Sequence, residues 1–263
     1  MEDKKQEAAE NKNSSQAKSR SYRLPSLDQE FILSDEMRGV RFLMEYSKAD
    51  ITLHRWGIHS TIVVFGSARI REDGNEHSRR WYNEARKFGR IASERGGALR
   101  SNGGLRDNVI ATGGGPGAME AANRGASEVG APTIGFNITL PHEQEPNSYS
   151  TPGLTFLFHY FAMRKMHLAM RANALVVFPG GFGTFDELFE LLTLCQTNKM
   201  KQLPIVLFDK EYWSKAINFE YLAEVGMIHA EDLNLFSYAE TAEETWDILV
   251  EKGIPFPERD MDY

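Results

Sequence analysis

The stretch that decides the fold is residues 174–187, which read ALVVFPGGFGTFDE. Its first five residues are apolar and include two valines, a pattern typical of a strand buried in a parallel sheet. Glycines then interrupt the apolar run, and residues 185–199 follow the spacing of a helix. A buried strand that turns through glycine into a helix is the repeating unit of α/β proteins.

The same unit recurs before and after this stretch. We predict further strands at 61–65, 108–112, 132–137, 154–158 and 204–208. We predict further helices at 77–94, 118–129, 161–171, 212–225 and 242–251. Alternating strands and helices of these lengths predict an α/β fold in which a doubly wound parallel sheet carries helices on both faces.

Composition shifts along the chain predict four segments. Residues 1–22 are polar up to Tyr22, so a disordered tail is expected there. Residues 23–57 carry apolar side chains at near-helical spacing, which predicts an N-terminal helical extension. The sheet domain then covers 58–252, and 253–263 form a C-terminal tail.

Charge and residue counts exclude several classes of function. The formal net charge of −7 argues against a nucleic-acid groove, which needs a concentrated basic surface. The single cysteine, Cys195, permits no intrachain disulfide and predicts a cytoplasmic protein. No apolar run reaches the roughly 20 residues that span a bilayer, so no membrane partner is expected. The seven histidines show no metal-binding spacing, so no metal site is expected.

Glycine-rich turns follow three of the predicted strands, at residues 65–68, 112–117 and 178–184. In parallel sheets ligands bind beyond the carboxyl ends of the strands, where these turns lie. A helix that starts there presents free N–H groups and a partial positive charge, which suit an anion. Any one such turn could serve only to pack a strand against a helix. Three at one sheet edge favour a ligand site.

The middle turn fits the dinucleotide pattern G-x-G-x-x-[G/A] formally, through Gly113, Gly115 and Ala118. That pattern also expects an acidic residue about 20 positions on, and the next strand ends instead at Asn137. A nicotinamide cofactor is therefore disfavoured. The chain has no G-x-x-x-x-G-K-[ST] sequence, which argues against a P-loop ATPase.

The last turn leads into Thr184-Phe-Asp-Glu187, which has the spacing of a capping box. We predict Thr184 as the N-cap and Glu187 three residues later, and a well-capped helix alone would account for both. The glycines just before could instead hold a phosphate, with the Glu187 carboxylate facing a sugar carbon. Arg164 and Lys165 open another helix against its dipole, which suggests that they meet an anion.

Taken together, residues 113–126 (GGGPGAMEAANRGA), the Arg164-Lys165 pair and residues 179–187 (PGGFGTFDE) closely resemble the LOG ("Lonely Guy") family. These are cytokinin riboside 5′-monophosphate phosphoribohydrolases, and many members have been labelled lysine decarboxylase-like. The resemblance covers about residues 61–250, and the 60 residues before it resemble the longer members, which would favour plain AMP. It implies a Rossmann-like fold.

The resemblance also implies a hydrolase that cleaves the N-glycosidic bond of a nucleoside 5′-monophosphate. AMP or an N6-substituted AMP such as a cytokinin nucleotide would give the free base and ribose 5-phosphate, without a cofactor. Arg164 of the family's RK motif and Glu187 of its PGGxGTxxE motif are the expected catalytic residues. One departure is Phe161, where shorter members carry Met. The expected substrate-binding residues are Gly66, Ser67, Gly114, Gly115, Gly117, Glu143, Arg164, Lys165, Gly180, Gly181, Gly183 and Thr184.

Two other functions remain open from the sequence. A pyridoxal phosphate-dependent lysine decarboxylase would need a Schiff-base lysine, for which Lys165 is the candidate beside the expected phosphate site. A non-catalytic nucleotide sensor or carrier on the same fold would bind AMP and release nothing. Apolar residues on the helices at 161–171 and 185–195 exceed what one sheet face needs, which predicts a homodimer and allows a larger homo-oligomer.

Overall fold

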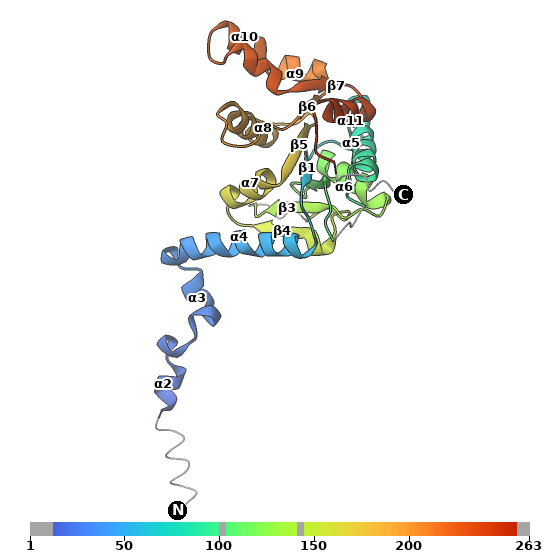
Figure 1. The fold of residues 1–263 in the computed structure, drawn as a ribbon. Helices are drawn as coiled ribbons and strands as arrows, with labels where there is room; N and C mark the ends of the chain where they lie inside the picture. Colours follow the sequence, from blue (N-terminus) through green and yellow to red (C-terminus); the bar gives the residue numbers. More distant parts are fainter. Residues whose placement is uncertain (1–12, 100–103, 141–144, 257–263) are drawn as a thin grey trace, which may run out of the picture. The chain divides into compact units, whose positions relative to one another are not determined.

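The computed structural model describes residues 13–99, 104–140 and 145–256. Its centre is a seven-stranded sheet in the order β4-β3-β2-β1-β5-β6-β7, in which every neighbouring pair is parallel (Figure 1). The strands are β1 (Thr61–Phe65), β2 (Val109–Thr112), β3 (Ile134–Ile138), β4 (Thr155–Phe158), β5 (Ala172–Val177), β6 (Ile205–Phe208) and β7 (Ser237–Ala239).

Strand order reverses in the middle of the sheet. From β1 the chain adds β2, β3 and β4 in one direction, and it then returns to place β5 on the other side of β1. Thr61 to Phe65 of β1 pair with Ala172 to Val177 of β5 along the whole strand. Such a reversal is the point at which open α/β sheets bind their ligands, beyond the carboxyl ends of the strands.

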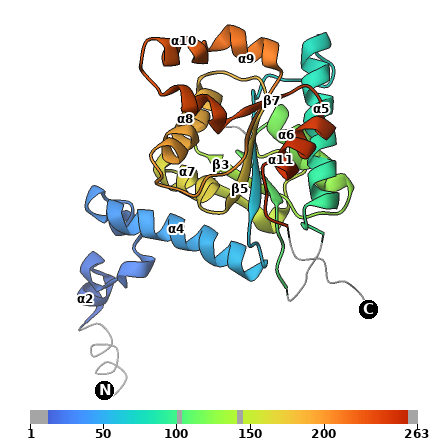
Figure 2. The same ribbon diagram turned by 45° about the horizontal axis from the view of Figure 1, so that its top comes forward.

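Helices cover both faces of the sheet, as the sequence predicts (Figure 2). One face carries α5 (Glu76–Arg95), α6 (Ala118–Glu128) and α11 (Ala242–Glu251). The other carries α7 (Phe161–Met170) and α8 (Phe182–Gln196). The short helices α9 (Lys210–Ala216) and α10 (Phe219–Glu224) follow β6, and 3-10 turns lie at Pro152–Leu154 and Ala230–Leu235. The α/β class is therefore confirmed.

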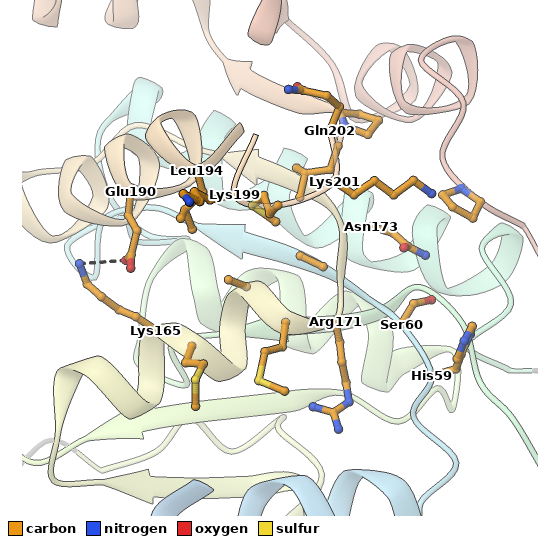
Figure 3. A pocket seen from close by; sticks show the side chains of 18 of the residues that line it. His59, Ser60, Lys165, Arg171, Asn173, Glu190, Leu194, Lys199, Lys201 and Gln202 are labelled. Carbon is orange, nitrogen blue, oxygen red and sulfur yellow. Dashed lines mark ion pairs between the residues drawn. The ribbon is translucent and has the colours of Figure 1, made fainter. Parts of the chain in front are cut away.

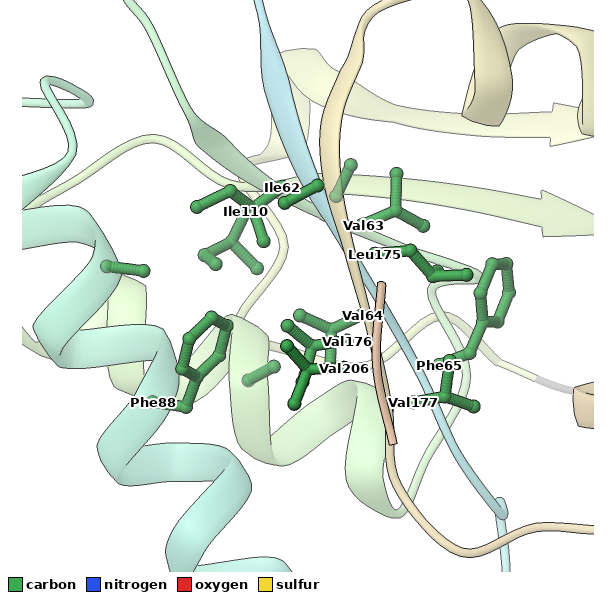
Figure 4. Close-up of a cluster of buried hydrophobic side chains, with 14 of the residues drawn as sticks. Ile62, Val63, Val64, Phe65, Phe88, Ile110, Leu175, Val176, Val177 and Val206 are labelled. Atoms are coloured by element: carbon green, nitrogen blue, oxygen red, sulfur yellow. The ribbon is translucent and has the colours of Figure 1, made fainter. Parts of the chain in front are cut away.

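The core is built on the two central strands, because they are buried on both faces (Figure 4). Ile62 and Val64 of β1 point toward α5, where the Phe88 ring is fully buried. Val63 and Phe65 point to the opposite face. This alternation along one strand explains why its sequence is a continuous apolar run and not an alternating one.

The described residues divide into two units: one starts at Lys48, and the N-terminal one ends at Ser47. Its described elements are α2 (Ser14–Lys18), 3-10 turns at Arg20–Tyr22, Pro25–Leu27 and Asp35–Met37, α3 (Gln29–Ile32), and the start of α4 (Arg38–Arg55). The first helix and turn lie within the predicted disordered tail. The Asp28 side chain caps α3 by accepting a hydrogen bond from the Phe31 N–H at 3.2 Å.

Three elements differ from the prediction. The predicted helix 212–225 is two helices, because the chain is extended at Ile217 and Asn218 then caps α10 by accepting from the Tyr221 N–H. The three-residue edge strand β7 was not predicted. Helix α8 begins at Phe182, three residues before the predicted start. None of the described helices is long and apolar enough to span a bilayer.

Candidate active site

A cavity of about 660 Å³ lies at the point where the strand order reverses. The turn after β1 forms one wall, from Phe65 to Arg69, and the turn after β5 with the start of α8 forms another, from Gly180 to Glu187. Phe161 and Arg164 of α7, Met119 of α6 and Tyr212 of α9 complete the lining. Its volume falls within the roughly 300–1,000 Å³ typical of small-molecule sites.

The structure brings together most of the site residues that the sequence predicts. Eight line this cavity: Gly66, Ser67, Arg164, Gly180, Gly181, Gly183, Thr184 and Glu187. They come from three separate segments of the chain, which meet because β1 and β5 are neighbours and end at the same edge of the sheet. Glu143 lies outside the described residues.

The glycines after β2 do not line this cavity. A Cβ on Gly117 would lie 2.2 Å from the Ser67 carbonyl oxygen, and its φ of +78° favours glycine. The Ala118 N–H donates to the same oxygen at 3.2 Å. Gly117 therefore allows the turn after β2 to pack against the turn after β1, whereas Gly114 and Gly115 contact the buried Asn147 through their carbonyls.

Helix α8 starts without a side-chain cap, so the predicted capping box is wrong. Gly181 is the N-cap residue, Thr184 is already the third residue of the helix, and Glu187 lies in its second turn. Thr184 folds back over Gly180 so closely that a Cβ there would lie 2.1 Å from the Thr184 Oγ1. The helix therefore begins after Gly181, three residues before the position at which Thr184 would be the N-cap.

The absence of a cap leaves donors for a ligand. The first helical bond is from the Phe185 N–H to the Gly181 carbonyl, at 3.0 Å. Among the described residues no acceptor meets the N–H groups of Phe182 and Gly183. Free N–H groups at a helix start carry the positive end of its dipole, which suits a phosphate.

Arg164 and Glu187 form a buried ion pair at this cavity. Arg164 Nη2 lies 3.1 Å from Glu187 Oε1, and the residues are 9% and 5% exposed. Burial raises the pKa of Glu187 to about 7, against the opposing charges of Arg164 and Lys165. Burial likewise lowers the pKa of Arg164. A carboxyl group that titrates near neutrality in a cavity is a candidate for catalysis.

Among the described residues, one polar atom of Arg164 has no partner. Its Nε is buried and meets no acceptor among the described residues. Its guanidinium carbon lies 5.8 Å from the centre of the Phe161 ring, which lines the same cavity. The arrangement holds the guanidinium between an aromatic face and the Glu187 carboxylate, so both charged groups have fixed positions.

Lys165 turns elsewhere, because neighbouring helical residues point about 100° apart. Its Nζ lies 2.8 Å from Asp186 Oδ2 and 3.0 Å from Glu190 Oε2, both on α8. Figure 3 shows Lys165 paired with Glu190 at a different cavity, of about 640 Å³, away from the glycine turns. Arg164 and Lys165 therefore do not bind one anion together. Arg164 pairs with Glu187 inside the site, and Lys165 joins α7 to α8 through Asp186 and Glu190.

Arg69 and Tyr212 are among the lining residues that the sequence did not predict as site residues. Arg69 is exposed at the rim and has no ion pair with any described residue. Its position just after Gly66-Ser67 in the turn could have suggested it. Tyr212 reaches the cavity from α9, and its hydroxyl donates to the Gly180 carbonyl. No local pattern predicts that contact, since 32 residues separate the two.

Residues 119–249 match the family model described as "Possible lysine decarboxylase". Two relatives from Oryza sativa subsp. japonica are named "Probable cytokinin riboside 5'-monophosphate phosphoribohydrolase". LOGL3 is 31% identical over 98 residues, 36% of this chain and 46% of its own. LOG4 is 28% identical over 148 residues, 55% of this chain and 63% of its own. The matched region thus spans about half to two thirds of these relatives.

The fold also has a solved counterpart. The X-ray structure titled TM1055 aligns with a TM-score of 0.51 at 20% sequence identity. The alignment covers 73% of this chain and 99% of that one. At this identity the likeness concerns the fold, and it confirms the Rossmann-like arrangement of the sheet domain.

Proposed function

Because the chain belongs to the family that includes the LOG-type phosphoribohydrolases, we propose that it hydrolyses the N-glycosidic bond of a nucleoside 5′-monophosphate. The substrate is AMP or an N6-substituted AMP of the cytokinin type. The products are the free base and ribose 5-phosphate. One observation carries the proposal: a buried Arg164–Glu187 pair lines the same cavity as the uncapped start of α8.

The 5′-phosphate binds at the start of α8. The free N–H groups of Phe182 and Gly183 supply donors, and Arg69 supplies an exposed positive charge at the rim. The glycine turn offers room for close approach, since nothing lies within 4 Å of a Cβ built on Gly181 or Gly183. This anchoring sets the distance between the phosphate and the sugar carbon that reacts.

Glu187 acts on that sugar carbon. Breaking the N-glycosidic bond leaves positive charge on C1′ and on the ring oxygen, as in glycoside cleavage. The ionised carboxylate stabilises this charge or orients the attacking water. Water adds its oxygen to C1′ and the base departs with the bonding electron pair. One of the water's protons passes to the base nitrogen, and the other stays on the new C1′ hydroxyl.

Arg164 keeps Glu187 ready for that role. Its charge opposes the effect of burial and favours the ionised carboxylate, and their 3.1 Å contact fixes the carboxylate's direction. Preorganised charge of this kind is worth roughly 100- to 1,000-fold in rate per group.

The decarboxylase alternative is weaker because of the state of Lys165. Burial lowers the pKa of its amine, but the bonds to Asp186 and Glu190 outweigh that effect and raise it. A Schiff base forms from a neutral amine that is free to attack a carbonyl. This amine is charged and is held by two carboxylates.

We also propose that the chain is a homodimer through α7 and α8. Large apolar side chains on these helices are exposed: Phe161 at 50%, Met170 at 46%, Phe182 at 94% and Phe189 at 38%. An apolar surface of this kind marks an interaction site in a globular protein. Sedimentation of the full chain should give twice the monomer mass, and Phe189→Glu should shift it toward the monomer.

The activity is tested with a panel of nucleoside 5′-monophosphates, each followed by chromatography of the released base and assay of ribose 5-phosphate. We expect adenine from AMP or an N6-substituted adenine from the corresponding nucleotide. Adenosine, which lacks the phosphate, should react roughly 100-fold more slowly or worse, the loss expected when a preorganised anion contact is removed. Tight AMP binding without base release would replace this proposal with the sensor or carrier.

A further inference from the structure

A tyrosine from a distant helix holds the glycine turn at its tightest point. The Tyr212 hydroxyl of α9 donates to the Gly180 carbonyl, one residue before the N-cap of α8. Tyr212 is partly buried, and its ring packs edge-on against Trp81 at 5.9 Å between ring centres. Its hydroxyl therefore meets the turn from a side chain that is held by packing.

Tyr212 is itself positioned by a buried carboxylate. Asp209 Oδ1 accepts the Tyr212 N–H at 2.9 Å and caps α9. Asp209 Oδ2 accepts from Trp81 Nε1 at 2.7 Å and from Arg80 Nη1 at 3.0 Å, both on α5. Asp209 is 4% exposed and has a φ of +72°, a conformation that side chains rarely adopt.

The result is a continuous series of contacts from α5, on one face of the sheet, to the cavity. It runs from Arg80 and Trp81 through Asp209 to Tyr212 and ends at Gly180. Strained backbone of the kind seen at Asp209 persists only where the surroundings determine it. Here the surroundings are three donors on one carboxylate.

The direction of the Gly180 carbonyl matters for an anion. A peptide group is planar and trans, so its carbonyl and its N–H point in opposite directions. A bond that holds the Gly180 oxygen on Tyr212 therefore also fixes the direction of the Gly181 N–H, at the N-cap. Without that bond the peptide of two glycines can rotate and turn its partly negative oxygen toward the cavity.

We infer that Tyr212 is a positioning residue for phosphate binding: by holding the Gly180 carbonyl it keeps the peptide dipoles of the glycine turn favourable to an anion, and Asp209 aligns it. The inference rests on the proposed function for the identity of the anion. Burial raises the pKa of the Tyr212 hydroxyl, so it remains a donor at neutral pH.

The test is Tyr212→Phe, which removes only the hydroxyl. Titration calorimetry with ribose 5-phosphate should show affinity reduced by roughly three- to tenfold, the loss expected for one hydrogen bond. KM for AMP should rise by the same factor, with kcat changed less than about twofold. Asp209→Asn should shift both quantities in the same direction. Tyr221→Phe, at an exposed tyrosine of α10, is the matched control and should change neither.

The outcomes separate this inference from the proposed function. If the unaltered chain releases base and Tyr212→Phe keeps its ribose 5-phosphate affinity and KM, or loses kcat alone, the positioning role is wrong. If no base is released but Tyr212→Phe still weakens ribose 5-phosphate binding, the positioning role stands and the hydrolase proposal fails. If the unaltered chain binds no ribose 5-phosphate, both fail.

Discussion

Glu187→Gln gives the sharpest test of the proposed chemistry. Gln has the same shape and can still accept the Arg164 Nη2 hydrogen bond that Glu187 accepts at 3.1 Å. It lacks the negative charge that the proposed transition state needs. We expect base release from AMP to fall by about 100- to 1,000-fold, which corresponds to roughly 3–4 kcal/mol. Arg164→Lys, which keeps a charge but loses the fixed guanidinium, should lie between the Gln variant and the unaltered chain.

The same variant has a predictable effect on stability. Glu187 has a pKa of about 7 in the folded chain against 4.5 ordinarily, because burial disfavours its charge. The folded chain therefore binds this proton more readily than the unfolded chain between about pH 4.5 and 7. Stability falls as pH rises through that window, by up to about 3 kcal/mol. The Gln variant lacks this fall, although it leaves Arg164 without its counter-charge.

Urea unfolding at about pH 5, near the lower end of this window, and at about pH 8, above its upper end, measures this change in the free energy of unfolding. Relative to the unaltered chain, the Gln variant should be more stable at the higher pH than at the lower one. Chromatography of released adenine measures the activity on the same samples. A Gln variant with normal turnover would show that Glu187 is not catalytic. If the unfolding free energies of the two chains change equally between the two pH values, the Glu187 carboxylate is not buried as described.

Other perturbations address the remaining parts of the site. Log(kcat/KM) for AMP should rise with pH up to about 7 and then level off, because the ionised Glu187 is the active form. The phosphate of AMP titrates in the same pH range. The pH profile of Glu187→Gln is therefore the comparison, and it should lack only the rise that comes from the carboxyl group. Arg69→Gln should raise KM for AMP about tenfold at low salt with kcat unchanged, and added salt should shrink the difference. Gly180→Ala should lower the melting temperature and abolish phosphate binding, because its Cβ would lie 2.1 Å from Thr184 Oγ1, whereas Gly183→Ala has free space and should melt normally.

Much of the fold followed from local sequence patterns. The β-branched and apolar run of β1 predicted its bounds, 61–65, because a strand buried on both faces has apolar side chains on both. Helix α11 was likewise predicted with its bounds, 242–251, since Thr241 caps it in the ordinary way. The edge strand β7 was missed because three residues are too few to show an alternating or continuous apolar pattern.

The site was less predictable than the fold. Glycine turns at strand ends located the cavity, because parallel strands bring their carboxyl ends to one edge. The capping box failed because Thr184 packs back on Gly180, a contact that spacing alone does not reveal. Lys165 was separated from Arg164 by the helical rotation and by two acidic residues on another helix. Tyr212 acts through tertiary contacts with α5 and could not be inferred from its neighbours in the sequence.

The reversal of strand order has a consequence for how this protein can change over time. The two turns that frame the cavity follow the innermost strands, β1 and β5, while β4 and β7 lie at the outer edges of the sheet. Lengthening or trimming β7 leaves the reacting groups where they are, whereas a change in β4 reaches Arg164, because β4 leads directly into α7. Substitutions at the inner pair move both walls at once, so novelty is expected to accumulate from the β7 margin inward.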